Sequence, residues 1–535
     1  MMLVFTVLSQ VAQAVNPPPD GGYPGGNTAE GHLSLGSLTT GLYNTGVGIY
    51  SLLSITDGKF CTGVGAGALF ANTGDQNTAI GAGALFSNTT GVGNTANGAF
   101  ALFSNTGQGN TAVGADALLK NTTGPFNTAT GFGALVNNTD AVGNTADGAF
   151  ALQNNTSGVQ NTATGGQALS NNTQADGNTA NGFQALFTTS LGAYNTATGY
   201  QALLNNTESY NTAYGAEALK NNTTGTHNTA TGTIALSGNV GGNNNTATGY
   251  GALGSNTSGG GNTAVGYQAL AFNDIGTNNT AIGISAESHD INGSNNVAIG
   301  LEALFSNNGG FQNVAIGSDA LLDNVTGFDN IAIGSSAGHF ITGNDNIDIG
   351  SSGVAGESGV TRIGSGLQSK TFISAIRGVT TGNANAIPVL IDSAGQLGTL
   401  SSSRRFKHDI KPMEKTSEAV LALKPVTFHY NSDKTGKAQF GLIAEEVAEV
   451  NPDLVVRDDK GEIYTVRYDA INAMLLNEFL REHKAFLEEQ SKVQKLEAAL
   501  QAVNQSLKEQ AAQIQKVSAQ VQVTKPVPQI AENER

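Results

Sequence analysis

The stretch GNTAVGADALLKNTTG, residues 109–124, is repeated with small changes along most of this 535-residue chain. The segments NTATGYQALLNNT (195–207) and NTAVGYQALAFND (262–274) keep its frame, in which Asn-Thr-Ala-x-Gly is followed by x-x-Ala-Leu and Asn-rich turn residues. The first residue of the frame recurs twenty times between Asn27 and Asn346, every 17 or occasionally 16 residues. A period this strict is the signature of a repeat architecture.

A very short alternating segment with glycine at a fixed place predicts a mainly β fold. We expect a parallel β-roll, or solenoid, of about twenty 17-residue repeats that forms a shaft over residues 27–366. One repeat has only an Ala, a Leu and a β-branched residue to bury, so it must stack on its neighbours. The Asn column should place identical amides about 4.8 Å apart, where each bonds the next repeat, and Gly should form a corner. The pattern leaves open whether x-x-Ala-Leu is a strand or a helical turn.

The later repeats carry the strand-like steps NNVAIG (295–300), QNVAIG (312–317) and DNIAIG (329–334). These VAIG steps and the earlier TAxG steps resemble the head repeats of trimeric autotransporter adhesins. That resemblance implies three chains that wind parallel β-rolls about one axis. The repeat of this chain is longer than the adhesin repeat, and the additional residues fall around x-x-Ala-Leu.

Charge and cysteine content exclude several classes of protein. Through residue 400 the chain carries 6 Lys or Arg against 21 Asp or Glu, and an acidic surface of this kind repels nucleic acid. The single cysteine, Cys61, stands where the other repeats place Asn, so it has no disulfide partner. The seven His show no metal-like spacing, and the repeats show no carboxylate pair or Ser-His-Asp set for an external substrate. We therefore expect no cofactor and no metal.

The N-terminal run MMLVFTVLSQVAQA, residues 1–14, ends in Ala12-Gln13-Ala14 and fits the cleavage site of a secretory signal peptide. An apolar chain end without a targeting role is the alternative. A Pro/Gly linker follows over 15–26. No other segment approaches the roughly 18 apolar residues of a spanning helix, so the sequence predicts no integral membrane span. The protein is expected to be secreted, at the cell surface or, if it derives from a phage, part of a virion fibre.

Beyond the repeats the composition becomes rich in Lys, Glu and Gln, and a small α+β module is expected. Neck strands are predicted over 367–401, within SGLQSKTFISAIRGV (365–379) and IPVLIDSAGQLGTL (387–400). The module proper, residues 402–470, should contain the strand KPVTFHYN (424–431), the helix FGLIAEEVAEVNPDLVV (440–456) closed by Asn-Pro, and the strand EIYTVRY (462–468).

A long helix is predicted from near Asp469, with a coiled coil over residues 471–525. Apolar residues recur there every seven positions, and further apolar residues follow three positions after some of them, which is the pattern of a coiled-coil seam. These residues are Phe486, Val493, Leu500, Leu507, Ile514 and Val521, followed by Leu496, Val503 and Val517. The pattern favours oligomerisation over a solitary amphipathic helix. Pro526 and Pro528 end the helix, leaving the tail 526–535.

Three motifs of this module occur together, SSRRFKHDI (402–410), GLIAEEV (441–447) and YDAINAMLLNEF (468–479). In order and spacing they resemble the C-terminal intramolecular chaperone and auto-processing domain of phage tail spikes and endosialidases. The resemblance implies a domain that trimerises, templates the fibre before it, and then cuts itself off immediately before a serine. The family pattern is Ser-Asp-x-Arg-x-Lys. Ser402, Arg405 and Lys407 match it, whereas Ser403 stands where Asp is usual.

The expected chemistry is that of a serine autoprotease with a Ser-Lys dyad. Serine becomes a nucleophile when a base takes its proton, and lysine is that base only when burial or a nearby cation favours its neutral form. Ser402 would be the nucleophile, Lys407 the base and Arg405 a supporting cation, and the bond between Ser401 and Ser402 would be cut. The alternative is an uncleaved fibre in which the module remains a permanent trimer clamp. A homotrimer is expected in both cases, and a surface glycan is a possible ligand of the shaft.

Overall fold

The structure, a computed structural model, describes residues 23–368, 370–373, 387–392, 395–458 and 460–523. The predicted signal peptide, most of the Pro/Gly linker and the tail 526–535 lie outside the described residues. The chain divides into two compact units, residues 1–372 and 373–535.

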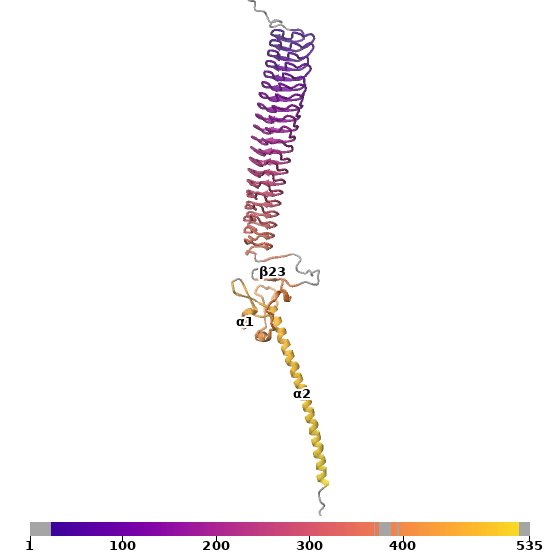
Figure 1. The fold of residues 1–535 in the computed structure, drawn as a ribbon, viewed down its shortest axis with the longest axis vertical. Coiled ribbons are helices and arrows are strands. Elements are labelled where there is room, and N and C mark those ends of the chain that lie inside the picture. The colour runs from indigo at the N-terminus through magenta and orange to yellow at the C-terminus, as the bar shows by residue number, and fades with distance from the viewer. Residues whose placement is uncertain (1–22, 369, 374–386, 393–394, 459, 524–535) are drawn as a thin grey trace, which may run out of the picture. The chain divides into compact units, whose positions relative to one another are not determined.

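The first unit is a parallel β-solenoid in which each strand pairs in register with the next one along the chain (Figure 1). Thr111, for example, lies opposite Thr95 on one side and Thr128 on the other. The predicted fold class is confirmed, and a further strand follows the twenty predicted ones. The strands are β1 Thr28–Glu30, β2 Thr45–Val47, β3 Thr62–Val64, β4 Thr78–Ile80, β5 Thr95–Asn97, β6 Thr111–Val113, β7 Thr128–Thr130, β8 Thr145–Asp147, β9 Thr162–Thr164, β10 Thr179–Asn181, β11 Thr196–Thr198, β12 Thr212–Tyr214, β13 Thr229–Thr231, β14 Thr246–Thr248, β15 Thr263–Val265, β16 Thr280–Ile282, β17 Val297–Ile299, β18 Val314–Ile316, β19 Ile331–Ile333, β20 Ile347–Ile349 and β21 Thr361–Ile363.

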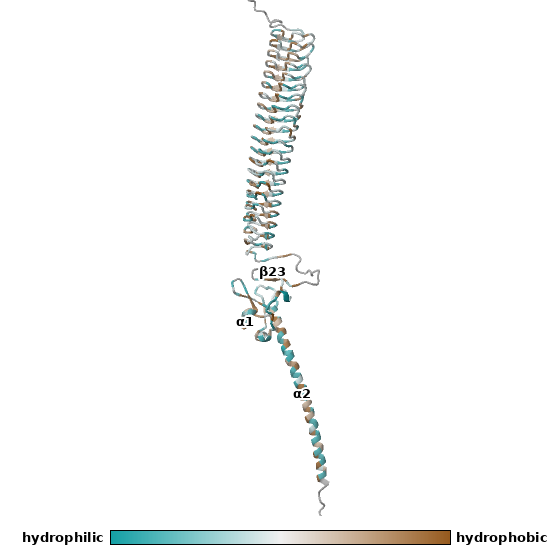
Figure 2. Cartoon of the chain, viewed as in Figure 1, coloured by the Kyte–Doolittle hydropathy of each residue, from teal (hydrophilic) through white to brown (hydrophobic). Residues whose placement is uncertain are grey.

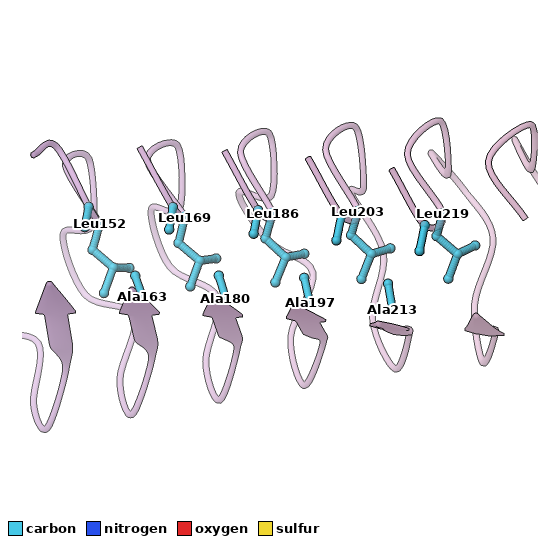
Figure 3. Packing of buried hydrophobic residues seen from close by; sticks show 14 of the residues in the cluster. Leu152, Ala163, Leu169, Ala180, Leu186, Ala197, Leu203, Ala213 and Leu219 are labelled. Atoms are coloured by element: carbon cyan, nitrogen blue, oxygen red, sulfur yellow. The ribbon is translucent and has the colours of Figure 1, made fainter. Parts of the chain in front are cut away.

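The core of the solenoid is a stack made mainly of alanine and leucine side chains that repeat from rung to rung. In Figure 3, Leu152, Leu169 and Leu186 repeat from rung to rung, with the strand alanines Ala163 and Ala180 beside them. All of these side chains are fully buried. One rung contributes few apolar atoms, so burial is completed by the rungs on either side. The prediction that the Ala and Leu of each repeat face inward is therefore confirmed.

The x-x-Ala-Leu segment is neither a strand nor a helical turn. It is a run of successive tight turns, in which the Leu119 N–H donates to Asp116 O at 3.3 Å and the Asn121 N–H donates to Leu118 O at 3.1 Å. Asp116 and Leu118 have positive φ values of 58° and 53°. A left-handed conformation costs a leucine about 1–2 kcal/mol. Burial of its side chain, worth about 1.5–3 kcal/mol, offsets that cost. The Leu118 N–H also donates to Ala134 O of the next rung at 3.0 Å.

Two columns of buried asparagine hold the rungs in register. In the first, the backbone N–H of Asn110 donates to Asn94 Oδ1 of the previous rung at 2.9 Å, and Asn110 Nδ2 donates to Gly124 O at 2.9 Å. The second column lies eleven residues further on, where Asn121 Nδ2 donates to Asn105 Oδ1 at 2.6 Å. Buried amides stabilise only when they are bonded, and these bond both within and between rungs. The sequence analysis predicted the first column and treated the second as turn residues.

The last two rungs replace the inward alanine by charged residues. Asp348 of β20 lies opposite Ala332 on one side and Arg362 of β21 on the other. The Arg362 guanidinium pairs with Glu357, which raises the pKa of the arginine and lowers that of the carboxyl. Charged side chains in place of alanine end the apolar stack at this edge.

The second unit contains short antiparallel hairpins, short helices and one long helix. Its strands are β22 Leu390–Ile391, β23 Leu397–Gly398, β24 Val426–Phe428, β25 Gln439–Gly441, β26 Val455–Arg457 and β27 Ile463–Val466. Its helices are the 3-10 helices η1 Arg404–Phe406, η2 Glu414–Ala422 and η3 Pro452–Leu454, and the α-helices α1 Ala444–Val450 and α2 Tyr468–Val523. The strands within 424–431 and 462–468 and the start of the long helix follow the prediction. The helix predicted over 440–456 is shorter than expected: its first two residues belong to β25 and its last two to β26, and α1 ends just before Asn451-Pro452. The strand predicted in 365–379 is wrong for its described part, because residues 365–368 and 370–373 form no strand.

The heptad residues of helix α2 are exposed to solvent in the single chain, and hydrophobic residues recur along the helix (Figure 2). The six heptad residues are exposed, with Ile514 at 69% and Val493 at 46% as the extremes. Among the described residues, no helix is both long and apolar enough to cross a membrane. The apolar residues of α2 thus form a stripe along a water-exposed helix.

Candidate active site

The predicted cleavage site lies on an exposed tight turn at the start of the module. Ser401 and Ser402 are irregular in backbone conformation, and Arg404–Phe406 form the 3-10 turn η1. The Phe406 N–H donates to Ser403 O at 3.0 Å, and the Lys407 N–H donates to Arg404 O at 3.1 Å. These bonds fix the turn locally, without support from a buried core, since η1 contains no buried residue.

Within a single chain the turn separates Ser402 from Lys407. Ser402 precedes η1 by two residues, whereas Lys407 follows it directly, and both side chains are exposed. Within the described part of the chain no hydrogen bond joins the two side chains. A Ser-Lys pair needs such a bond and shielding from water to react. The isolated chain brings these residues to the same turn but does not assemble them into a dyad.

Arg405 lies against its neighbour in the turn. Its guanidinium carbon is 4.6 Å from the centre of the Phe406 ring, a cation–π contact. This contact directs the arginine along η1 and gives the exposed Phe406 ring a partner. In the single chain Arg405 thus contacts Phe406 of the same turn.

A small apolar core holds the elements behind this turn together. Its buried residues come from η2, α1, η3, β26, β27 and α2, and they are Val420, Val447, Leu454, Val455, Val466, Ile471 and Met474. The Tyr468 hydroxyl at the start of α2 accepts a hydrogen bond from the Leu442 N–H at 3.0 Å. The motifs 441–447 and 468–479, which are separate in sequence, thus meet in one core.

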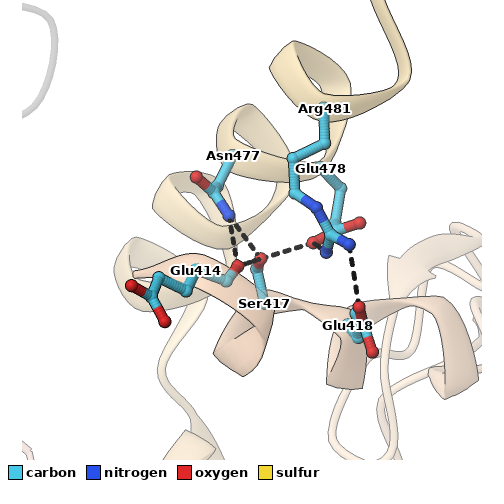
Figure 4. A network of polar contacts seen from close by, with 6 residues as sticks. All are labelled: Glu414, Ser417, Glu418, Asn477, Glu478 and Arg481. Atoms are coloured by element: carbon cyan, nitrogen blue, oxygen red, sulfur yellow. Dashed lines mark hydrogen bonds and ion pairs between the residues drawn. The ribbon is translucent and has the colours of Figure 1, made fainter. Parts of the chain in front are cut away.

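A buried polar network fastens η2 to α2 (Figure 4). The Ser417 hydroxyl, fully buried, donates to Glu478 Oε1, and Asn477 Nδ2 donates to Ser417 Oγ at 2.6 Å. Arg481 bridges the Glu478 and Glu418 carboxylates, at 2.8 Å each. The Ser417 hydrogen bond, followed by the arginine, holds the pKa of Glu478 below its usual value. The sequence analysis missed this network, because its two halves lie about sixty residues apart with no shared pattern.

Residues 402–456 match the family described as chaperone of endosialidase. No curated protein matches the chain, and no solved structure matches it. The match confirms the resemblance of the module to that intramolecular chaperone family, which is classed among the peptidases.

The chaperone-of-endosialidase match begins at Ser402, includes Lys407, η2 and α1, and ends within β26. It supports an intramolecular chaperone role for this part of the chain. Among the described residues, no cluster of three or more His, Cys, Asp or Glu is placed to hold a metal ion.

Proposed function

We propose that the chain is a homotrimeric fibre whose C-terminal module chaperones assembly and then cleaves itself between Ser401 and Ser402. The observation that carries this proposal is the family match, which begins at Ser402 and contains the serine, arginine and lysine of the auto-processing pattern. The repeat solenoid would be the shaft of the fibre. The fibre would be secreted, held on a cell surface or part of a virion.

The reaction is an acyl transfer that needs only the chain and water. Neutral Lys407 takes the Ser402 hydroxyl proton, and Ser402 Oγ attacks the carbonyl carbon of Ser401. The peptide bond breaks as the Ser402 nitrogen leaves with the proton held by Lys407, and an ester joins Ser401 to Ser402 Oγ. Water hydrolyses that ester, which frees the Ser401 carboxylate and restores the hydroxyl. Arg405 would stabilise the turn or favour neutral Lys407.

Two uncovered apolar faces support assembly. One is the stripe of α2 described above, which has the spacing of a coiled-coil seam. The other is the outward third residue of the strands β15 to β21, which is Val or Ile in all seven, whereas β13 and β14 have threonine there. Extended apolar faces rarely stay exposed to water in a soluble protein. Burying both against two further copies would remove them from solvent.

Assembly would also complete the active site. Ser402 and Lys407 are exposed and unbonded to each other in the single chain, so shielding must come from another copy or from a change of the turn on assembly. We therefore propose that cleavage follows trimer formation and does not depend on protein concentration once trimers exist.

Gel electrophoresis of boiled and unboiled protein, with mass spectrometry of the products, tests the proposal. Wild type should yield a shaft ending at Ser401 and a 134-residue fragment starting at Ser402. Ser402→Ala and Lys407→Ala should each leave a full-length trimer. The matched control Ser403→Ala keeps the neighbouring backbone and should still be cut. A wild-type trimer that stays intact would favour the permanent clamp, and cleavage of Ser402→Ala at the same bond would exclude this nucleophile.

A further inference from the structure

The second asparagine column shows how one rung bonds to the next. From Asn88 to Asn172, each Nδ2 donates to the Oδ1 of the column asparagine one rung earlier, at 2.6–3.3 Å. The same bonds recur from Asn222 to Asn273, at 2.6–2.7 Å. Each amide in this ladder both donates and accepts, so the ladder continues only while every rung supplies an N–H.

Where the next rung lacks an asparagine, an oxygen of the ladder is left without a partner. Asn172 Oδ1 is buried and unpartnered, and the column residue of the following rung is Thr189. Asn324 Oδ1 is also unpartnered, and Ile341 follows it in the column. An unpartnered buried oxygen costs free energy, so these positions are weak points of the stack.

One rung breaks two interior columns at once. Asp290 takes the place of the second asparagine, and Glu287 takes the place of the inward leucine. Both are fully buried. Asn273 Oδ1, one rung earlier, is unpartnered, and so are Glu287 Oε2 and Asn307 Oδ1. Three buried acceptor oxygens without a donor thus occur on this rung and on the two rungs next to it, and one of them belongs to the Glu287 carboxyl.

The hydrogen bonds to these carboxyls come only from neutral groups. Asp290 Oδ1 accepts from the N–H groups of Gly293 and Gly309 at 2.8 and 3.2 Å, and Asp290 Oδ2 lies 3.5 Å from Asn279 Nδ2. Glu287 Oε1 accepts from Asn296 Nδ2 at 2.7 Å. Within the described residues, neither carboxyl forms an ion pair. Two buried carboxylates with amide partners alone are costly to ionise.

The ionisable groups that surround this rung are few. Among the described residues, Asp290 is the only charged group that acts on Glu287. The other side chain that faces Glu287, besides Asn296, is the neutral amide of Asn307 on the next rung. The exposed His289 ring contacts Phe272 and Phe305 on the outside of the solenoid. Asp274 and His289 line the same surface groove, away from the buried carboxyls. No lysine or arginine acts on either carboxyl, which leaves the proton as the ligand that can neutralise them.

We propose that the rung formed by Glu287 and Asp290 is a proton-dependent joint in the shaft. A neutral carboxyl carries an O–H donor. Protonated Asp290 would donate to Asn273 Oδ1 and restore the ladder. Protonated Glu287 would donate from its otherwise unpartnered Oε2 to Asn307 Oδ1. Loss of the protons leaves like charges and unpartnered oxygens inside the stack, which favours local opening of this rung.

The expected pH course follows from burial. Burial raises the pKa of Asp290 from 3.8 to about 6 and that of Glu287 well above its usual value. The folded rung then holds its protons more tightly than the open rung does, so protection is greatest at acid pH and is lost as the pH rises through the folded pKa. The Asp290 shift alone corresponds to about a hundredfold change in the opening equilibrium, developed between about pH 4 and about pH 6.

Hydrogen exchange of the full chain, followed by mass spectrometry, tests the joint. Peptides covering 283–300 should lose protection as the pH rises from about 4 through about 6, after correction by an unstructured peptide of the same sequence. Peptides covering 245–261, in an unbroken part of the ladder, should not. The double variant Glu287→Leu/Asp290→Asn restores the repeat and should abolish the pH dependence. Asn239→Asp should create the same behaviour in a new rung, whereas Asp274→Asn, at a half-buried acid outside both interior columns, should change nothing.

Two results would overturn this inference. One is a pH dependence of 283–300 that is the same in the double variant and the parent chain. The other is recovery of protection at alkaline pH on addition of calcium chloride, reversed by chelation, because a cation rather than the proton would then neutralise the rung.

Discussion

Cys61 interrupts the first asparagine column of the shaft. Its backbone N–H donates to Asn44 Oδ1 at 3.0 Å as an asparagine would, but its thiol replaces the side-chain amide. The backbone N–H of Asn77, which would bond the side-chain oxygen of an asparagine at position 61, bonds the Cys61 sulfur instead. Sulfur is a weaker hydrogen-bond acceptor than an amide oxygen. Burial, the largest influence, raises the pKa of the thiol and keeps it neutral.

We expect Cys61→Asn to stabilise the shaft by about 1 kcal/mol, the typical net worth of a restored hydrogen bond. The thermal midpoint of the purified protein measures the gain. The reverse change, Asn110→Cys, should cost a similar amount. Equal midpoints for Cys61→Asn and the parent chain would show that the column bonds contribute little.

Glycine at the corner of each rung is required by the closeness of the next rung. A Cβ on Gly114 would lie 2.5 Å from the carbonyl oxygen of Gly131, and its φ is +131°. Gly93 also has positive φ, at +66°, but a Cβ there would meet no atom within 4 Å. The two glycines separate the cost of steric overlap from the cost of backbone conformation.

Gly114→Ala should therefore destabilise the shaft by about 3 kcal/mol or more, since backbone must move apart. Gly93→Ala should cost only about 1 kcal/mol, for the left-handed conformation alone. Chemical denaturation of the two variants under the same conditions compares them. Equal losses would mean that the rungs are not as close as the corner geometry requires.

At the scale of elements, we expect α2 to need partner chains for its stability in water. Its apolar seam is uncovered in one chain, and isolated helices of mixed composition are only marginally stable. Leu500→Asp places a charge in the seam, whereas Ala498→Asp places the same charge at a position away from it. Sedimentation should show that Leu500→Asp reduces or abolishes the trimer and that Ala498→Asp does not. A trimer that survives Leu500→Asp would place the assembly contacts elsewhere.

The network between η2 and α2 should make the module sensitive to acid. The pKa of Glu478 is lowered, mainly by the Ser417 hydroxyl, so the stability it contributes is present above the ordinary glutamate pKa and is lost as the pH falls through the folded value. The denaturant midpoint of the module should fall as the pH decreases. Glu478→Gln should remove the share of this fall that comes from protonation of Glu478. Glu445→Gln, on an exposed part of α1, is the control and should leave it.

For the whole molecule, we expect the shaft to need the C-terminal module in order to fold but not in order to remain folded. A chain that ends at Ser401 should aggregate or assemble poorly when expressed alone, because a single rung buries too few apolar atoms to be stable and leaves its strand edges open until the stack is complete. A shaft released by cleavage after assembly should remain folded, since its unfolding rate governs its lifetime. Solubility and the boiled and unboiled gel pattern compare the two. A soluble trimer from the truncated chain would remove the need for the chaperone.

The same molecule should respond to pH in opposite directions in its two units. The Glu287–Asp290 rung is most stable when protonated, whereas the Ser417–Glu478 network is most stable when ionised. Both responses come from the surroundings of carboxyl groups, which are amides and burial in the shaft but a hydroxyl and an arginine in the module.

The repeats were open to prediction because their contacts are periodic. Thr111 meets Thr95 and Thr128, one period away on each side, so the spacing of like residues already contains the register of the sheet. The inward Ala and Leu, the corner glycine and the bonded Asn column follow from the same spacing. The strand within 424–431 and the start of α2 followed from local patterns in the module.

Other features depend on how distant or unlike residues meet in three dimensions. The successive turns with Leu118 at positive φ arise because inter-rung bonds and burial together outweigh a local preference. Ser417 finds Glu478 across sixty-one residues that share no period. Ser402 and Lys407, five residues apart in sequence, remain unjoined in one chain because an exposed turn has no core to bring their side chains together. A periodic pattern specifies its own neighbours, whereas a single contact between different segments exists only once the chain has folded around it.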